Sequence, residues 1–288
     1  MKYEFIEKER SVFVLERMCR VLAVSRSGYY RWKKQVLSKR RQQDNEYMLV
    51  QINESHRKSH ETYGSPRIYR DIRAEGIVCG KNRIARLMRI HGIQAKAKKK
   101  YKATTNSRHN LPIAPNLVCR NFVSNRPNKV WVSDITYIWT QEGWVYLAVI
   151  LDIFSRMIVG WSISARLTDE LVVESLHQAQ RKRNSGRGLV FHSDRGVQYA
   201  SKNFRSMLMA YGFKQSMSRK GDCWDNAPAE SFFHTLKTEL VYGKVFMTRE
   251  EARREIFEYI EMFYNQVRRH SALGYCAPGV YEQKALAA

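Results

Sequence analysis

The chain has 288 residues, of which 44% are hydrophobic and only 6 are Pro, which excludes a disordered chain and predicts at least one sizeable core. Lys and Arg number 50 against 27 Asp and Glu, and the resulting formal charge of +23 predicts a polyanionic partner, either nucleic acid or an anionic membrane. No apolar run approaches the roughly 18 residues of a membrane span, and the first residues lack a signal peptide's apolar stretch. We therefore expect a soluble, cytoplasmic protein.

The positive charge is concentrated in the front of the chain. Residues 1–125 contain 28 basic and 10 acidic residues, a formal charge of +18, which predicts a basic binding module joined to a separate body. The five cysteines lie at least 40 positions apart, so the spacing fits neither a disulfide framework nor a zinc module and indicates reduced thiols. His56 and His60 stand one helical turn apart, and without a cysteine pair we interpret them as polar residues rather than metal ligands.

The first predicted unit, residues 1–40, is a helix-turn-helix. Leu15, Met18 and Leu22 recur at helical spacing, and after a short break Ser25 can cap a second, aromatic and basic helix. The alternative is a small helical hairpin with a solvated basic face. We expect four residues of the second helix to bind DNA: Arg26, Tyr29, Arg31 and Lys33.

A second helix-turn-helix-like unit is predicted over residues 41–95. One long polar helix around 42–59 precedes two short helices, with Ser65 as a cap before Pro66 and with Gly76 and Gly92 as stops. In the simplest packing Ile68 and Ile72 face Ile84 and Leu87. That arrangement leaves five basic residues for solvent or DNA phosphate, namely Arg67, Arg70, Lys81, Arg83 and Arg86.

Residues 96–125 form a predicted basic linker, because the apolar periodicity stops and prolines punctuate the segment. A solvated tether is sufficient to explain this composition. A cationic segment between two DNA-handling units would also follow a phosphate backbone, and on that reading Lys98, Lys99 and Lys100 contact DNA.

From residue 126 the pattern changes to strands. Segments 130–140, 144–153 and 157–164 predict an antiparallel meander, followed by a helix to about 184, a short strand, a helix over 201–211, a weak strand near 214–218 and a helix from Pro228. The order β-β-β-α-β-α-β-α predicts an α/β fold, a mixed sheet flanked by helices, over residues 126–245. Residues 246–288 form a predicted helical extension, whose apolar stripe over 249–266 would pack inside the molecule or against a second protomer.

Three acidic residues of the predicted α/β region do not lie on the solvated faces of predicted helices. Asp134 sits within an apolar strand, Asp194 ends the fourth strand, and Glu230 falls in the first turn of the helix after Pro228. Carboxylates from strand ends and a helix start can converge at one sheet edge as an oxygen cluster suited to Mg²⁺ or Mn²⁺. Each acid also has a structural explanation: a buried hydrogen-bonded strand residue, a turn former and a helix-dipole partner.

These acids lie within sequence motifs that closely resemble those of the OrfB catalytic protein of the bacterial IS-three family of insertion sequences. The motifs are WVSDITYI, FHSDRGVQYAS and WDNAPAESFFHTLKTEL, with further matches at SRSGYYRW, TYGSPRIYRDI and YNQVRRHSALGYCAP. The resemblance spans nearly the whole chain. It implies a ribonuclease-H-like fold with the DDE catalytic triad of integrases and transposases, formed here by Asp134, Asp194 and Glu230.

The resemblance also implies the reaction. We expect a DNA transposase, a polynucleotidyl transferase that binds the terminal inverted repeats of its element and catalyses 3′-end cleavage, strand transfer and integration. The three carboxylates would hold two Mg²⁺ or Mn²⁺ ions per active site. Expected partners are double-stranded DNA of the element ends and target, a second copy in at least a dimer on DNA, and an upstream OrfA protein or fusion, with the protein at the bacterial nucleoid.

Three further residues receive roles near the triad. Lys237 lies seven residues after Glu230 and so shares its helix face. The family pattern implies that this basic residue contacts DNA near the terminus. Trp131 and Asn226 flank the acids and could support them, although Asn226 could equally be a helix cap. Asp152 ends the second strand outside the triad, and we interpret it as structural.

Two other functions are compatible with the sequence. A structure-selective nuclease of the same fold would cut branched or hybrid substrates regardless of the inverted-repeat sequence. A DNA-binding regulator descended from a transposase would need no catalytic acids, and the complete acidic triad argues against it.

Overall fold

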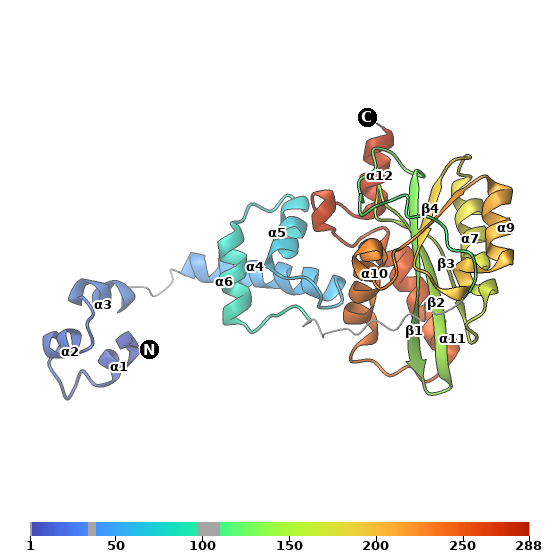
Figure 1. Cartoon of the computed structure of the whole chain (residues 1–288). Coiled ribbons are helices and arrows are strands. Elements are labelled where there is room, and N and C mark those ends of the chain that lie inside the picture. Colours follow the sequence, from blue (N-terminus) through green and yellow to red (C-terminus); the bar gives the residue numbers. More distant parts are fainter. Residues whose placement is uncertain (1, 34–38, 97–109, 288) are drawn as a thin grey trace.

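The first helical unit contains three helices, one more than the sequence predicted. The computed structural model describes residues 2–33, 39–96 and 110–287, and the unit comprises α1 (Lys2–Lys8), α2 (Leu15–Val21) and α3 (Arg26–Lys33) (Figure 1). Its small core is formed by Ile6, Met18, Cys19 and Tyr29. The backbone N–H of Gly28 donates to Ser25 Oγ at 2.9 Å, so Ser25 caps α3 as predicted.

The second helical unit comprises α4 (Lys39–Lys58), α5 (Ser65–Ala74) and α6 (Lys81–Ile90). Ile68, Ile72, Ile84 and Leu87 are all buried between these helices, which confirms the predicted packing. Gly76 and Gly92 follow α5 and α6 with φ angles of +83° and +66°, the left-handed conformation that ends a helix at glycine. The predicted cap was wrong by one position: Ser65 is the first helical residue and Gly64 occupies the N-cap.

The last described range, residues 110–287, contains the region that the resemblance predicts to be catalytic, and we call it the catalytic body. It is built on a five-stranded mixed sheet, as predicted. The strands are β1 (Val130–Thr140), β2 (Gly143–Asp152), β3 (Ile158–Ser164), β4 (Val190–Ser193) and β5 (Lys214–Met217). Their spatial order is β3-β2-β1-β4-β5, in which β1, β2 and β3 pair antiparallel while β4 lies parallel to both β1 and β5. The predicted α/β class and element order are therefore confirmed.

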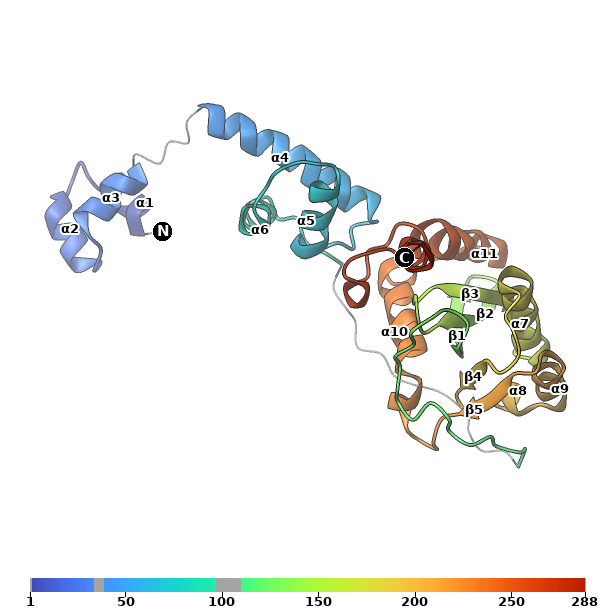
Figure 2. The ribbon, with the colours of Figure 1, turned by 90° about the horizontal axis from the view of Figure 1, so that it is seen from above.

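Helices cover both faces of this sheet (Figure 2). One face packs against α7 (Asp169–Arg183), α8 (Val197–Ala200) and α9 (Lys202–Tyr211), and the other against α10 (Ala227–Leu236) and α11 (Arg249–Phe257). Successive residues of a strand point to opposite faces, so Trp131 is buried in the first core and Val132 in the second. Both sides of the central strand are thus covered.

The C-terminal region folds back onto the sheet. Its predicted helix is α11 followed by a π-helical turn over Glu258–Tyr264, and the apolar stripe of Ile256, Tyr259, Ile260 and Phe263 is buried in the core shared with β1 and β2. Of the two alternatives for this stripe, the structure shows packing inside the molecule. Helix α12 (Pro278–Leu286), which lies within the predicted helical extension, is anchored to α7 by an ion pair between Arg183 and Glu282.

The cysteine and histidine side chains singled out in the sequence make the following contacts. Within the described side chains the cysteines are free thiols, and His56 Nε2 lies 3.1 Å from the carbonyl oxygen of Gln94. His60 packs edge-on against the Phe263 ring, at 4.9 Å between centroids. Across the described ranges, every helix is too short or too polar to cross a membrane.

His270, in the loop before α12, gives the fold a sensitivity to acid. Burial, together with Arg268, Arg156 and Arg67, lowers its pKa from 6.5 to about 4. The neutral ring is therefore favoured in the folded state, whereas the unfolded chain takes up a proton near pH 6.5. We expect the free energy of unfolding to fall by about 2 kcal/mol between pH 7.5 and pH 5 through this residue. In thermal unfolding, His270→Gln should flatten that decline, and parallel wild-type and variant curves would contradict the assignment.

Candidate active site

The sheet register places two of the three predicted carboxylates side by side. β1 and β4 pair in parallel, and the last paired residues are Ser133 and Ser193. The residues that follow them, Asp134 and Asp194, therefore lie side by side where this pairing ends. Neighbouring strands lie about 4.8 Å apart. Glu230 is in the first turn of α10, which packs against β1. The fold therefore brings together the three acids that the sequence selected.

Electrostatic coupling links all three groups. Burial raises the pKa of Asp134 well above its ordinary value, and the nearby charges of Asp194 and Glu230 raise it further. The pKa of Glu230 is also raised, by burial and then by Asp194. Like charges at such a site favour either protonation or a bound cation.

The carboxylates are not closed around a single point. Among the residues that the structure describes, no three His, Cys, Asp or Glu side chains are arranged to hold one metal ion together. Two of the acids are instead oriented by local backbone contacts: the N–H of Ile135 donates to Asp134 Oδ1 at 2.8 Å, and the N–H of Gly196 donates to Asp194 Oδ1 at 2.9 Å.

A buried hydrogen-bond network supports the strand beneath Asp134. Asn226 Nδ2 donates to the carbonyl oxygen of Ser133 at 3.1 Å, and Ser133 Oγ lies 2.7 Å from the Tyr199 hydroxyl. Asn226 therefore ties the segment before α10 to the residue preceding Asp134, which agrees with its predicted supporting position. Trp131 does not contact the acids: it is fully buried on the opposite face, and its Nε1 donates to Asp152 Oδ2 at 3.3 Å.

Asp152 is structural, as the sequence analysis inferred. Its carboxylate is fully buried at the end of β2 and accepts the backbone N–H groups of Asn128 at 2.7 Å and Phe154 at 2.9 Å. These contacts join Asn128, just before β1, to the turn after β2. The hydrogen bonds described for the Asp152 carboxylate come from Asn128, Trp131 and Phe154, and none comes from the three acids.

Sequence reasoning missed Asp225, which organises the segment leading to Glu230. This buried carboxylate accepts hydrogen bonds from the side chains of Arg219, Arg120 and Asn116, and the Arg219 contact is the largest cause that holds its pKa far below the usual range. Its carbonyl oxygen lies 2.9 Å from Nε2 of the buried His192 on β4. The only sequence signal was its place beside Asn226, because Arg120 and Asn116 are more than 100 positions away.

Lys237 lies immediately after α10 and faces the site. Its ammonium is 5.1 Å from the centre of the Tyr137 ring, and only 6% of the residue is exposed. Burial lowers its pKa, while the negative charge of Asp134 opposes that shift. The small exposed area limits how much of Lys237 a DNA strand could reach, and its common face with Glu230 and its contact with DNA stay predictions.

The predicted DNA-binding residues of α3 differ in accessibility. Arg26 and Arg31 are exposed, and Lys33 is exposed but pairs with Glu7 at 2.7 Å. Tyr29 requires a correction. It has no exposed surface, and its hydroxyl donates to Glu7, because its position on the helix points into the core of the unit. Tyr29 is a core residue rather than a direct DNA contact.

The second unit divides its basic residues in the same way. Arg70, Lys81 and Arg86 are exposed. Arg83 instead bonds Asn45 Oδ1 through Nε at 3.1 Å and Nη2 at 2.8 Å, and half-buried Arg67 lies over the Tyr63 ring at 5.4 Å. Three residues of the predicted basic linker, Lys98, Lys99 and Lys100, lie outside the described residues.

Comparison with known families agrees with this architecture. Residues 124–223 match the integrase core domain, residues 230–286 match a second integrase core domain model, and residues 42–101 match an HTH-like domain. The fold and site thus define an enzyme of the integrase and transposase class, a DDE polynucleotidyl transferase that acts on DNA.

Curated relatives identify the family. The chain is 46% identical over 267 residues to the insertion element IS600 uncharacterized 31 kDa protein of Shigella sonnei, covering 93% of this chain and 98% of the relative. It is 41% identical over 288 residues, all of both chains, to transposase InsF for insertion sequence IS3A of Escherichia coli strain K12. The chain belongs to the IS3 family of insertion-sequence transposases, which confirms the resemblance seen in the sequence.

Solved structures with a similar arrangement come from retroviral integrases. The simian T-cell lymphotropic virus intasome, in complex with a PP2A regulatory subunit, matches with a TM-score of 0.47 and 14% identity over 80% of this chain and 74% of that chain. The HTLV-2 integrase catalytic core domain in complex with magnesium matches with a TM-score of 0.38 and 16% identity, over 55% of this chain and 96% of that chain.

Proposed function

We propose that this transposase recognises the terminal inverted repeats of an insertion sequence with residues 1–95 and performs 3′-end cleavage and strand transfer with residues 126–245. The linker 96–125 would connect the two activities, and residues 246–288 would complete the catalytic body. The observation that carries the catalytic part is the register of β1 and β4, because it sets Asp134 beside Asp194 under the helix of Glu230.

The three carboxylates fit a divalent-metal centre. They supply only oxygen donors, and burial followed by the neighbouring carboxylate charges raises the pKa values of Asp134 and Glu230, an effect that a bound cation would oppose. Asp134, Asp194 and Glu230 would together hold the two ions. When bound, a Mg²⁺ or Mn²⁺ pair activates the attacking oxygen and stabilises the leaving one.

The direct test is incubation with DNA carrying the element ends in the presence of Mg²⁺. We expect nicking at the terminus and joining of the new 3′-hydroxyl to a second DNA. Branched and hybrid substrates lacking the repeat should be cut poorly. Specific binding without nicking or joining would count against the transposase activity, and cutting independent of the repeat would favour a structure-selective nuclease.

Metal binding should weaken in acid. Because burial and neighbouring carboxylates raise the pKa of Asp134, a proton competes with the cation over a higher pH range than at an ordinary aspartate. We expect the apparent Mg²⁺ affinity to fall up to about tenfold per pH unit below the raised pKa, with proton release on binding. Calorimetry in buffers of different ionisation enthalpy measures both quantities. Affinity independent of pH between 5 and 8 would contradict the proposed ligand role.

DNA binding should depend steeply on salt. Arg86 is exposed on α6, and its substitution by alanine should reduce the slope of log affinity against log salt by about 1 if it neutralises one phosphate. Arg181→Ala, on an exposed part of α7, is the control and should leave the slope unchanged. Equal slopes for wild type and Arg86→Ala would show that α6 does not face DNA.

We also propose that the active species is at least a dimer on DNA, because joining two ends requires that both be held at once. Native mass measurement of the complex with two end duplexes tests this stoichiometry. An active complex with one protein chain would refute it. An upstream OrfA partner or fusion, and a cytoplasmic location at the nucleoid, complete the proposed context.

A further inference from the structure

Two neighbouring arginines lie between the catalytic body and the second helical unit. Arg268 and Arg269 follow the π-helical turn that ends at Tyr264, in the segment YNQVRRHSALGY. Each forms an ion pair on a different side: Arg268 with the body and Arg269 with α5. Consecutive residues of one loop therefore contact both parts of the enzyme.

Arg268 binds the helical segment that carries Glu230. Its Nε lies 2.8 Å and its Nη2 2.6 Å from the carboxylate oxygens of Glu239, and the side chains of both residues are at most 6% exposed. The Tyr259 hydroxyl donates to the same carboxylate at 2.7 Å. Glu239 lies in the π-helical turn Lys237–Val241, which continues α10 without a break in helical backbone. The far end of the helix of Glu230 is thus fixed by Arg268.

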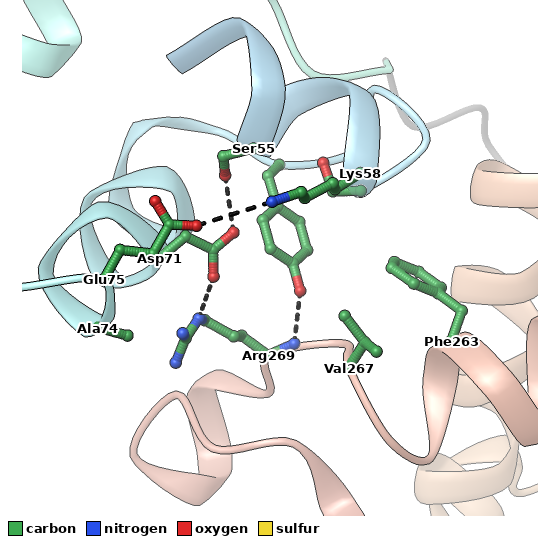
Figure 3. A pocket seen from close by; sticks show the side chains of 10 residues that line it. Ser55, Lys58, Asp71, Ala74, Glu75, Phe263, Val267 and Arg269 are labelled. Carbon is green, nitrogen blue, oxygen red and sulfur yellow. Dashed lines mark hydrogen bonds and ion pairs between the residues drawn. The ribbon is translucent and has the colours of Figure 1, made fainter. Parts of the chain in front are cut away.

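Arg269 binds the second helical unit (Figure 3). Its Nε donates to Asp71 of α5, and its backbone N–H donates to the Tyr63 hydroxyl at 2.6 Å. Asp71 is held in turn by Ser55 Oγ of α4 at 2.7 Å. Because these contacts involve α4, α5 and the segment between them, they restrain the unit as a whole.

Packing beside these contacts is incomplete. A cavity of about 210 Å³ lies between the two parts, lined among others by Ser59, Ala74 and Val267. Beyond it, apolar side chains of both parts, among them Tyr63, Ile68 and Phe263, belong to one continuous buried core. Apolar packing is not directional whereas hydrogen bonds are, so the bonds of Arg269 contribute direction to the angle of the unit.

We propose that Arg269 is a positioning residue which, together with Arg268, sets the register between DNA held by α4–α6 and the carboxylate centre. This inference rests on the proposed function, in which α4–α6 bind the element end and Glu230 belongs to the centre. A shift of the unit by about 1 Å at the contact would misplace the reacting phosphate and can cost roughly 100-fold in rate.

The test compares Arg269→Met with a matched buried pair elsewhere. Arg183→Met breaks the ion pair to Glu282 within the body and serves as the control for general loss of stability. At saturating end DNA, Arg269→Met should cleave at least tenfold more slowly and at several neighbouring phosphates, with DNA affinity within threefold of wild type. Arg183→Met should cleave at the single wild-type phosphate.

Two further variants keep the proposal falsifiable if Arg269→Met fails to fold. Tyr63→Phe removes only the acceptor for the Arg269 N–H and should broaden the cleavage positions to a smaller extent. The exchange Asp71→Arg with Arg269→Asp should restore a single position. The proposal is overturned if Arg269→Met or, where that variant fails to fold, Tyr63→Phe cleaves only the wild-type phosphate at the rate of Arg183→Met. Failure of the proposed function looks different, because the wild type itself would then not cleave the end DNA.

Discussion

Replacing Asp134 with asparagine is expected to lower cleavage and joining on the order of 10³-fold or more while leaving end-DNA binding intact. The substitution keeps the shape of the side chain and removes its charge. The charges of Asp194 and Glu230 both act on the Asp134 carboxylate, so its neutralisation affects two of the three pairs of carboxylates that could share an ion. Single-turnover assays with labelled end DNA measure both steps, and a mobility-shift titration measures binding.

Glu174→Gln provides the control for this experiment. Glu174 is a half-exposed carboxylate on α7, and in the described part of the chain it forms an ion pair with Arg181. Removal of its charge should therefore leave both reaction steps unchanged. Turnover of Asp134→Asn equal to that of Glu174→Gln would remove Asp134 from the centre. Loss of DNA binding by Asp134→Asn would instead indicate a structural defect.

The largest expected effect on stability comes from Gly160 in β3. A Cβ at this position would lie 2.4 Å from the carbonyl oxygen of Ser175 and 2.8 Å from the backbone nitrogen of Ala179. Both atoms belong to the backbone of α7, which cannot move aside as a flexible side chain would. We expect Gly160→Ala to lower the free energy of unfolding by about 3 kcal/mol, or to prevent folding.

Gly186 supplies the matched substitution. It lies in the loop before β4, and a Cβ there would meet nothing within 4 Å. Gly186→Ala should leave stability within about 0.5 kcal/mol of wild type or raise it slightly, because alanine has less freedom in the unfolded chain. Equal denaturant midpoints for the two alanine variants would show that α7 does not approach β3 as closely as described.

The strands of the catalytic body were predictable because their apolar runs are long and bounded by turn residues. Expected segments 130–140 and 157–164 match β1 and β3 to within one residue. The convergence of the acids followed from strand ends and a helix start. The order of the strands in the sheet could not be predicted in this way. β4 has four residues and pairs with a strand 60 positions earlier, and local periodicity does not encode such a contact.

Contacts between distant segments account for what the sequence did not reveal. The bonds of Asp225 to Arg120 and of Arg269 to Asp71 join residues 105 and 198 positions apart. Tyr29 is expected to contact DNA because its helix mixes aromatic and basic residues, yet its position on the helix places its side chain in the core. The short helix α1 completes that core through Ile6. Ile6 is a single buried residue in a charged segment, and this pattern did not predict a helix.

The central claim is that Asp134, Asp194 and Glu230 form one metal centre, and anomalous diffraction from crystals equilibrated with Mn²⁺ tests it most directly. We expect a Mn²⁺ peak coordinated by both Asp134 and Asp194, with carboxylate oxygens at the roughly 2.1 to 2.2 Å distance typical of such ligands. Asp134→Asn crystals treated identically should lose that peak. Mn²⁺ bound elsewhere on the wild-type protein, with none between these two carboxylates, would contradict the account.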